Sequence, residues 1–424
     1  MNAALKAPPV AGTTGLFFNP RDPEFHAYPY LQYARLRELD PVHRSPWGVW
    51  FIAKYEHVRS VLKDRRFRSQ DVPGQLRRRN HMLKTRRVTL NQPDNLDALI
   101  ANSENWFAFL EGMEHARLRR LVSYAFQKRH IEQMRAGIRD CVTTLLDALE
   151  GRDHFDLMAE FAKPLPQHTI AHLLGVPSDD IARCVTWANM LSRIFDPLLS
   201  LDEYASLNEA AQEFMAYLRD LIALRRAAPR DDLVSALIEA HDNEDRLTEN
   251  EIISTLTVMF TAGEETAVGL IGNGVLALTG HPQQRDLLRN HPELAANAVE
   301  ELLRYDSPFQ MTSRMALEDV ELGGKSIRKG DQIYVLLGAA NRDPAQFDNP
   351  DRLDIQRSRP HHMSFGDGLH VCVGAQLARM EVQEALVALL QRYPALDSPA
   401  QNLSYRKNAV LRCLNALQVT TQAA

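Results

Sequence analysis

The residues best placed to do chemistry are a cysteine and the glycines around it near the C-terminus. The stretch FGDGLHVCVGAQLARME occupies residues 365–381, and three glycines flank Cys372. Glycine is used where the backbone adopts positive φ angles or closely approaches another group. From residue 373 apolar side chains recur at three- and four-residue intervals, which predicts a helix that begins directly after the cysteine. Because the free N–H groups and positive dipole end of a helix favour a thiolate, Cys372 is a candidate nucleophile or metal ligand.

An acid and an alcohol interrupt the most apolar predicted helix, which opens with the capping-box pattern TENE and covers residues 248–279. In its middle the sequence AGEET, at 262–266, places two small residues before the polar ones. The cluster has a structural interpretation, in which Thr266 bonds back to the carbonyl of Ala262 and the glutamates reach solvent or cations. Within so apolar a helix, however, a polar cluster more often marks a functional site.

Two further pairs are spaced for contact on one face of a helix. Glu301 and Arg304 lie one turn apart, and His115 and Arg119 lie four residues apart beside an apolar stripe. Taken alone, the first pair fits a surface ion pair worth about 0.2–0.5 kcal/mol. The second pair alone fits a partly solvated basic helix, but two buried donors would require an anion.

Composition excludes several classes of protein. The chain has 424 residues, of which 45% are hydrophobic and 24% charged, and it contains no Pro/Gly/Ser-rich linker, so one large folded unit is expected. Four widely separated cysteines without a CxxC pair argue against a disulfide framework. The net charge of -5 argues against binding of nucleic acid over the whole surface. No apolar run approaches the length of about 20 residues that spans a bilayer, so we expect a cytoplasmic protein that does not associate with membranes.

The elements that must position these residues are mainly helical. Short β-branched or aromatic stretches at 48–55 and 331–337 predict a minor sheet. This pattern indicates a mainly α protein with a small β-sheet region at its side. The predicted helices cover residues 26–39, 115–149, 203–226, 231–241, 248–279, 284–304 and 373–391.

These motifs together resemble the cytochrome P-450 superfamily, specifically the soluble bacterial heme-thiolate monooxygenases. Residues 365–379 match the heme-binding signature Phe-Gly-x-Gly-x-His-x-Cys-x-Gly-x-x-Leu-Ala-Arg at every fixed position. Ala262, Gly263, Glu265 and Thr266 match the oxygen-binding segment of the family. The resemblance covers nearly the whole chain and implies the cytochrome P-450 fold, with a flexible tail at 1–15 and a single catalytic domain at 16–424.

The resemblance also implies roles for individual residues. Cys372 would supply the thiolate ligand of the iron in heme b, and Gly263 would leave space for oxygen. Thr266 and Glu265 would be catalytic, the alcohol bonding the oxygen at the iron and the acid linking it to a proton supply. Glu301 and Arg304 would form the structural pair of the family, joined by Arg352. The residues expected to hold the rest of the heme are His115, Arg119, Arg314, Phe365, His370 and Gly374.

Partners follow from the same resemblance. We expect a monomer that receives electrons from a ferredoxin and a ferredoxin reductase, docked where Arg117, Arg120, Lys128 and Arg129 offer positive charge. The expected substrate is a small lipophilic secondary metabolite, such as a polyketide or macrolide, which is hydroxylated or epoxidised. Its pocket would be lined by Leu256, Met259, Phe260, residues 309–312 and part of 70–110.

A basic run at 76–87 leaves the substrate's charge open. Arg77, Arg78, Arg79, Lys84, Arg86 and Arg87 occur there without an acid. The run fits a solvated loop, or an anionic or carrier-bound substrate at the entrance. No aromatic side chain interrupts it, which argues against nucleic acid.

Three other functions compete with the monooxygenase. A heme-binding sensor or carrier would need neither Glu265 nor Thr266. A thiol hydrolase would use Cys372 as nucleophile but leaves the arginines unexplained. A zinc site would use His361, His362, His370 and Cys372 but leaves the glycines unexplained. The other cysteines, Cys141, Cys184 and Cys413, are expected to be small buried apolar residues.

Overall fold

The computed structural model describes residues 16–20, 22–85, 95–196, 199–239, 241–242, 245–358 and 360–421. The expected tail at 1–15 lies outside these residues, as do Arg86 and Arg87 of the basic run.

Most of the described chain is helical, and two long helices begin with complete capping boxes, at Ser200/Glu203 and Thr248/Glu251. A π-helical turn, η1 (Met158–Ala162), and a 3₁₀ turn, η5 (Gly368–His370), complete the elements used below. The helices are α1 (Pro23–Ala27), α2 (Tyr30–Leu39), α3 (Tyr55–Lys63), α4 (Val72–Thr85), α5 (Asp97–Ser103), α6 (Gly112–Ala125), α7 (Lys128–Asp147), α8 (Pro164–Leu174), α9 (Ile181–Ser192), α10 (Leu201–Ala227), α11 (Leu233–Glu239), α12 (Glu249–Thr279), α13 (Pro282–Asn290), α14 (Ala295–Tyr305), α15 (Leu337–Ala340) and α16 (Ala375–Arg392).

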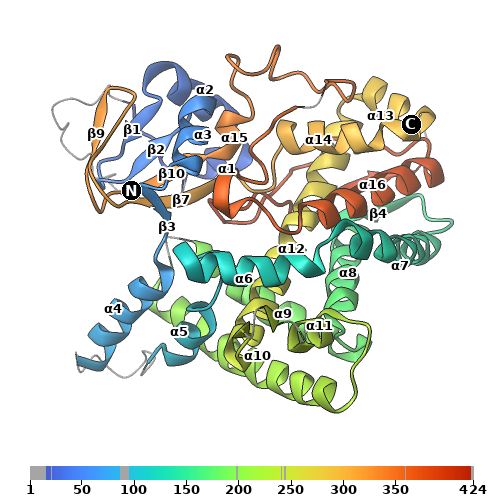
Figure 1. Ribbon diagram of the computed structural model, residues 1–424. Helices are drawn as coiled ribbons and strands as arrows, with labels where there is room; N and C mark the ends of the chain where they lie inside the picture. The colour runs from blue at the N-terminus through green and yellow to red at the C-terminus, as the bar shows by residue number, and fades with distance from the viewer. Residues whose placement is uncertain are drawn as a thin grey trace.

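A five-stranded sheet lies to one side of the helices (Figure 1). Its order is β1 (Val42–Arg44), β2 (Trp50–Ile52), β10 (Gln332–Leu336), β7 (Met311–Ala316) and β3 (Phe67–Ser69). Within this sheet β2 and β10 pair in parallel, with Ile333 opposite Trp50, and the sheet joins strands from residues 42–69 with strands from residues 311–336. The remaining strands form two-stranded pairs, β4 (His154–Asp156) with β11 (Gln418–Thr420), β5 (His241–Asp242) with β6 (Asp245–Arg246), and β8 (Val320–Leu322) with β9 (Lys325–Ile327).

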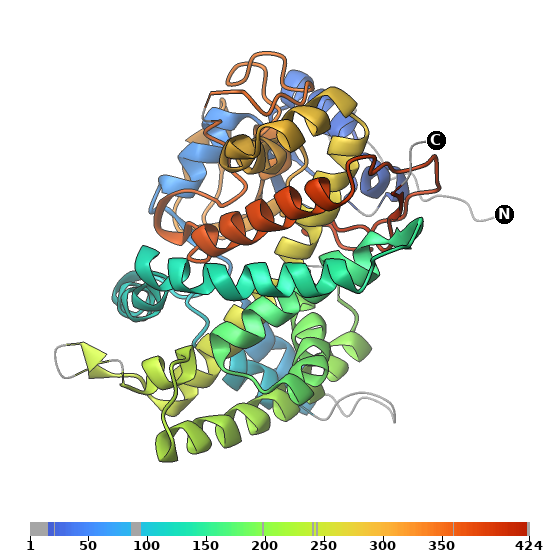
Figure 2. The same cartoon turned by 90° about the vertical axis from the view of Figure 1, so that its right-hand side faces the viewer.

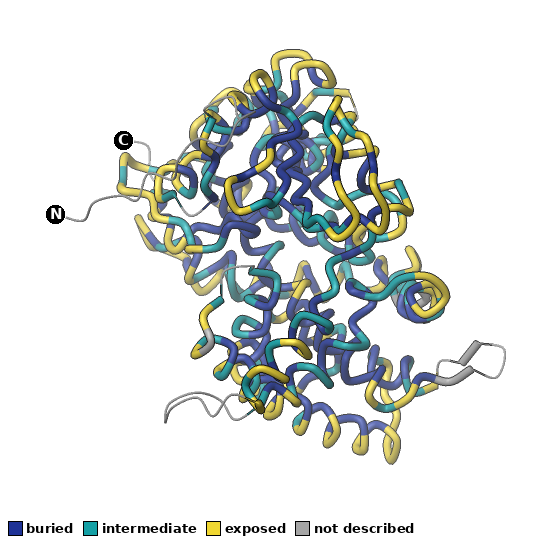
Figure 3. Tube along the Cα trace, turned by 90° about the vertical axis from the view of Figure 1, so that its left-hand side faces the viewer, coloured by how far each residue is buried: buried dark blue, intermediate teal, exposed yellow. Residues whose placement is uncertain are grey.

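Helix α12 passes through the middle of the molecule and belongs to two separate hydrophobic clusters. Its first half, up to Phe260, packs in a cluster with side chains of α4–α6 and α8–α11. Its second half, from Val268, packs in another with side chains of α7, α14 and α16. Buried backbone accordingly runs through both parts of the molecule (Figure 3). The polar segment 262–266 therefore lies where the two clusters meet.

Helices α7 and α16 lie side by side across the second cluster (Figure 2). Ion pairs from Arg135 and Arg139 of α7 to Glu384 of α16 join the outer faces of the two helices. The middle of α16, the helix that follows the cysteine loop, is thus held against α7.

The structure confirms the mainly helical class and the two predicted strand regions, and it corrects several predicted boundaries. The helix predicted at 26–39 divides at Pro29, because proline and the residue before it disfavour a continuous helix. The helix predicted at 284–304 divides before Pro292 for the same reason. The helix predicted at 115–149 divides at Gln127, whose ψ of 145° is extended. Helices α3, α4, α5, α8 and α9 were not among the predicted ones.

Candidate heme and oxygen site

The loop before α16 is shaped by two glycines and one hydrogen bond. Gly366 and Gly368 have φ angles of 72° and 73°, which side chains rarely adopt. A Cβ atom on Gly368 would also lie 2.5 Å from the carbonyl oxygen of Leu62, so this turn rests against the end of α3. The N–H of Cys372 donates to the carbonyl of Phe365 over 2.8 Å, which closes the loop below the helix.

Opposing effects act on the thiol of Cys372. Burial among protein atoms raises its pKa, although the residue retains exposed surface. Hydrogen bonds from the backbone N–H groups of Gly374 and Ala375, and the charges of Arg119 and Arg379, act to lower the pKa. The helix end thus presents hydrogen-bond donors to the sulfur of Cys372. A coordinating metal ion deprotonates a thiol outright, and these donors would then face a thiolate.

Four donor side chains predicted from the resemblance come together beside this loop. His115 lies on α6, and its ring centroid is 4.3 Å from that of His370. Arg119, one turn further along α6, donates to the carbonyl of Val371. Arg314, on β7, is 5% exposed and donates to the carbonyl of Ser313 over 2.8 Å.

This cluster of donors has one carboxylate among its described partners. Glu111 accepts from His370 over 3.2 Å, and its charge opposes the lowering of the Arg314 pKa, which burial brings to about 10. Burial and the neighbouring cations lower the pKa of His115 to about 4, and its Nε2 atom is buried without a partner. The orphaned nitrogen and the excess of donors fit a ligand that brings negative oxygen atoms. The two propionates of a heme meet this requirement, and Cys372 supplies the thiol beside them.

Phe365 and Gly374 were both expected to contact the heme, and the structure gives their contacts within the protein. The guanidinium of Arg379 lies 4.5 Å from the centroid of the Phe365 ring, and Arg379 pairs with Glu300 over 2.6 Å. A Cβ atom on Gly374 would contact only the ring of Phe126, at 3.8 Å. Packing within the protein does not explain why residue 374 is a glycine.

The middle of α12 has an accessible window in an otherwise buried helix. Ala262 and Gly263 are exposed, whereas the turns before and after them are buried. Thr266 donates from its hydroxyl to the carbonyl of Ala262 over 2.9 Å, as the structural interpretation of this segment predicts. A Cβ atom on Gly263 would lie 3.1 Å from the Cδ1 atom of Ile170 on α8, so close packing also favours a small residue there.

The two glutamates of this segment have different environments. Glu265 is 5% exposed and forms an ion pair through Oε1 with Arg406, while its Oε2 is buried without a partner. Glu264 is 2% exposed and accepts a hydrogen bond from Gln167 of α8 over 3.0 Å. Arg406, Gln167 and a third buried glutamate, Glu381 of α16, were not predicted, because nothing in their local sequence indicates these long-range contacts.

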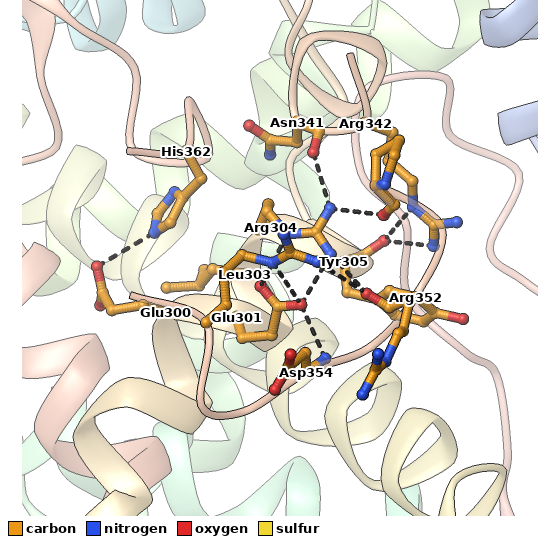
Figure 4. A network of polar contacts seen from close by, with 12 residues as sticks. Glu300, Glu301, Leu303, Arg304, Tyr305, Asn341, Arg342, Arg352, Asp354 and His362 are labelled. Carbon is orange, nitrogen blue, oxygen red and sulfur yellow. Dashed lines mark hydrogen bonds and ion pairs between the residues drawn. The ribbon is translucent and has the colours of Figure 1, made fainter. Parts of the chain in front are cut away.

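The pair Glu301 and Arg304 is fully buried and bidentate, with N–O distances of 2.7 and 2.8 Å (Figure 4). Arg352 does not complete it through its side chain, contrary to the expectation. Its guanidinium points away from Glu301 and is exposed, and only its carbonyl accepts from Arg304, over 3.1 Å. Arg357, five residues later, donates instead to both oxygens of Glu301 over 3.2 and 3.1 Å.

The two predicted basic surfaces are partly neutralised. Arg117 forms ion pairs with Glu114 and Glu251, and Arg129 bonds to His130. In the basic run, Arg77 pairs with Glu104 and Lys84 with Asp97, both over 2.9 Å, and Arg79 lies over the ring of Tyr204. Arg78 is exposed on α4.

Other expectations have mixed outcomes. Cys184 and Cys413 are buried as predicted, but Cys141 is half-buried. Among the described residues no group of three or more His, Cys, Asp or Glu side chains could hold a metal ion, which argues against the zinc site. Within the same residues, no helix is long and apolar enough to cross a membrane.

The residues expected to line the substrate pocket belong to different hydrophobic clusters. Leu256, Met259 and Phe260 are buried in the first hydrophobic cluster, together with side chains from residues 72–109. Phe309 packs with the sheet instead.

Comparisons with known proteins find one family throughout. The family model described as Cytochrome P450 matches residues 42–413. The polyketide biosynthesis cytochrome P450 PksS of Bacillus subtilis is 39% identical over 415 residues, which cover 96% of this chain and 98% of PksS. The 6-deoxyerythronolide B hydroxylase of Saccharopolyspora erythraea is 36% identical, over 93% of this chain and 96% of that protein. The crystal structure of P450BioI in complex with acyl carrier protein ligated to hexadec-9Z-enoic acid superposes with a TM-score of 0.86 at 38% identity, covering 94% of this chain and 99% of P450BioI.

Proposed function

The chain belongs to the cytochrome P450 family and is a heme-iron monooxygenase, and we propose that Cys372 ligates the iron of a heme b whose propionates are held by His115, Arg119, Arg314 and His370. The observation that carries the proposal is the convergence of four donors from α6, β7 and η5 beside a cysteine at the start of a helix. When bound, heme iron activates molecular oxygen, and a thiolate ligand donates electron density that favours cleavage of the O–O bond.

The chain's own residues would prepare and protect this chemistry. The N–H groups of Gly374 and Ala375 donate toward the sulfur of Cys372 and temper its charge when it is a ligand. Phe365 and Arg379 pack together at the start of the loop and keep it in place. Because these contacts are already formed within the protein, the loop that carries Cys372 would not have to rearrange when the sulfur binds iron.

Helix α12 would supply the groups that donate and accept protons. The hydroxyl of Thr266 donates to the Ala262 carbonyl and can turn toward a new acceptor beside the exposed window at 262–263. Glu265 is held by Arg406, so its free Oε2 has a fixed direction and can accept a proton from a neighbouring group. The apolar clusters on both sides of this segment limit the access of water.

We propose a lipophilic secondary metabolite as substrate, a polyketide or a macrolide, hydroxylated or epoxidised. Two relatives that cover nearly the whole chain carry polyketide biosynthesis or 6-deoxyerythronolide B hydroxylation in their names. The apolar side chains of Leu256, Met259 and Phe260 lie on α12 before the proposed oxygen site and suit such a molecule.

The substrate can also be bound to a carrier protein. The solved P450BioI holds an acyl chain on acyl carrier protein, and this chain has Arg78 exposed on α4. Because Arg77, Arg79 and Lys84 already have partners, Arg78 is the cation of the described run that remains available for an acidic partner.

Electrons would come from a ferredoxin and its reductase, at the surface formed by Lys128 and the neighbouring arginines. A monomeric state and a cytoplasmic location complete the proposal. A sensor or carrier of heme is the second candidate, but it gives no role to the ion pair between Glu265 and Arg406.

The proposed reaction is tested by finding the substrate. Metabolite fractions that shift the Soret band of the heme-loaded protein identify ligands, and turnover under ¹⁸O₂ then shows whether one labelled oxygen atom enters the product. A ligand that binds and is returned unchanged, while reductant and oxygen are supplied, would favour the sensor or carrier instead.

A further inference from the structure

Glu300 of α14 contacts residues on both sides of the loop that carries Cys372, and neither the buried ion pair of α14 nor the proposed mechanism uses it. It directly precedes Glu301, but the two side chains point to different partners (Figure 4). Its carboxylate accepts from His362, before the loop, over 3.3 Å. It also accepts from the Nε and Nη2 atoms of Arg379, on α16, over 2.6 and 2.9 Å. One carboxylate thus joins the chain before the loop to the helix after it.

The ring of His362 is oriented through both of its nitrogen atoms. The N–H of Ser364 donates to Nδ1 over 3.2 Å, so Nε2 carries the ring hydrogen and donates it to Glu300. The side chain of His362 is buried, with 3% of its surface exposed. The hydroxyl of Ser364 also donates to the carbonyl of Leu303 over 2.7 Å, which ties this part of the chain to α14 a second time. The beginning of the loop is therefore held against α14.

Arg379 connects Glu300 to the cysteine itself. Its guanidinium lies 4.5 Å from the centroid of the Phe365 ring, and the carbonyl of Phe365 accepts from the N–H of Cys372 over 2.8 Å. Burial raises the pKa of Cys372, and the charge of Arg379 is among the effects that act to lower it. Arg379 thus supports the loop by packing and acts on the sulfur through its charge.

Glu300 is an anion at neutral pH. Burial acts to raise its pKa, but the hydrogen bonds and charges of His362 and Arg379 outweigh burial and lower the pKa to about 2. The side chains of Glu300 and Arg379 are 25% and 26% exposed, so solvent and salt screen their attraction only in part. The ion pair therefore reduces the positive field that Arg379 exerts at Cys372.

We propose that Glu300 is a positioning residue that holds the cysteine loop at both ends and, by neutralising Arg379, keeps the reduction potential of the iron bound to Cys372 low. A positive charge near the sulfur favours the reduced iron, which holds one more electron, so an unpaired Arg379 would raise the potential. The electron that converts ferric to ferrous iron comes from the redox partner, and Glu300 itself exchanges neither an electron nor a proton. The inference rests on the proposed function, because it takes Cys372 as the iron ligand.

Reductive titration of the heme-loaded protein with dithionite, followed through the Soret band, tests the effect of the charge. Glu300→Gln keeps the shape of the side chain and removes its charge. Glu384→Gln is the matched control, because Glu384 also bridges two arginines, but these lie on α7. We expect Glu300→Gln to raise the equilibrium constant for reduction about tenfold, which is about 59 mV for a one-electron couple, and Glu384→Gln to match the wild type. Glu300→Asp restores the charge and should lie between Glu300→Gln and the wild type.

Arg379→Gln separates the effect of charge from a displacement of the loop. Removal of this cation should lower the potential, whereas Glu300→Gln should raise it. A general loosening of the loop would instead shift both variants in the same direction. An unchanged potential in Glu300→Gln, or shifts of the same sign in the two variants, would overturn the proposal.

Amide hydrogen exchange of the heme-loaded protein tests the positioning role without electron transfer. Peptides that cover residues 363–373 include the N–H of Cys372, which donates to the carbonyl of Phe365. Exchange in these peptides should be several-fold faster in Glu300→Gln than in the wild type and in Glu384→Gln. Equal rates in the three proteins would refute the positioning role. Evidence that Cys372 does not ligate the iron would refute the proposed function instead, and would leave the exchange result unaffected.

Discussion

Removal of Arg357 should destabilise the protein, whereas removal of Arg352 should not. Arg357 makes two charge-assisted hydrogen bonds to Glu301, and its side chain is 15% exposed. After Arg357→Ala, Glu301 still has Arg304 and the N–H of Asp354, so its charge is not left unpaired. We therefore expect a loss of about 2 kcal/mol, near the contribution of hydrogen bonds to a charged group. Arg352→Ala removes an exposed side chain whose contact is made by its carbonyl, so the change should stay within about 0.5 kcal/mol.

Glu301→Ala should cause the largest loss of stability among these variants. It leaves the guanidinium of Arg304, which is 0% exposed, without its counter-ion, and such a loss costs about 3–5 kcal/mol. Urea unfolding of the heme-loaded variants, followed by far-UV circular dichroism, gives the three values under one condition. We expect the free energy of unfolding to fall least for Arg352→Ala, more for Arg357→Ala and most for Glu301→Ala. A larger effect of Arg352→Ala than of Arg357→Ala would refute the assignment of the third charge to Arg357.

Three further outcomes are expected. The pKa of Glu264 is raised by burial from 4.5 to about 7, so the folded protein holds a proton that the unfolded chain releases, and stability should fall as pH rises from about 4.5 to 7. Glu264→Gln removes the contribution of Glu264 and leaves that of Glu381, so it should exceed the wild type by about 3 kcal/mol at pH 8 but not at pH 4, as urea unfolding at the two pH values can show. Thr266→Ala should divert reducing equivalents to hydrogen peroxide several-fold more than Thr266→Ser, measured as peroxide per NADH, and equal values would leave the hydroxyl without a role. Arg78→Glu should weaken binding of acyl carrier protein carrying a hexadec-9-enoyl chain about fivefold at low salt, and less at high salt. The control Arg219→Glu changes an arginine that is exposed on α10 and should leave the affinity unchanged. Equal affinities of the two variants would contradict the proposed carrier surface.

Local patterns in the sequence were sufficient for much of the fold. The capping box at Thr248 and Glu251 marked the start of α12, and the apolar periodicity after Cys372 marked α16. Prolines decided several of the boundaries that were wrong. Helices α8 and α9 were missed, and both are buried on several sides in the first hydrophobic cluster.

The candidate site was predictable where residues lie close together in the sequence. His115 and Arg119 share one face of α6, His370 and Cys372 share one loop, and the structure brings α6 and this loop together. The partners of the buried glutamates come from distant segments, since Arg406 is 141 residues from Glu265 and Gln167 is 97 residues from Glu264. The third partner of Glu301 illustrates the same limit, because the resemblance pointed to Arg352, whereas the side-chain contacts of the structure identify Arg357.

The central claim is that Cys372 ligates the heme iron, and the absorption spectrum of the reduced, carbon-monoxide-bound protein tests it most directly. Cys372→Ala is compared with the wild type and with Cys141→Ala, a half-buried cysteine of α7 that serves as the matched control. The wild type and Cys141→Ala should show the strongly red-shifted Soret band of thiolate ligation, and Cys372→Ala should lose it. Retention of that band in Cys372→Ala would contradict the account.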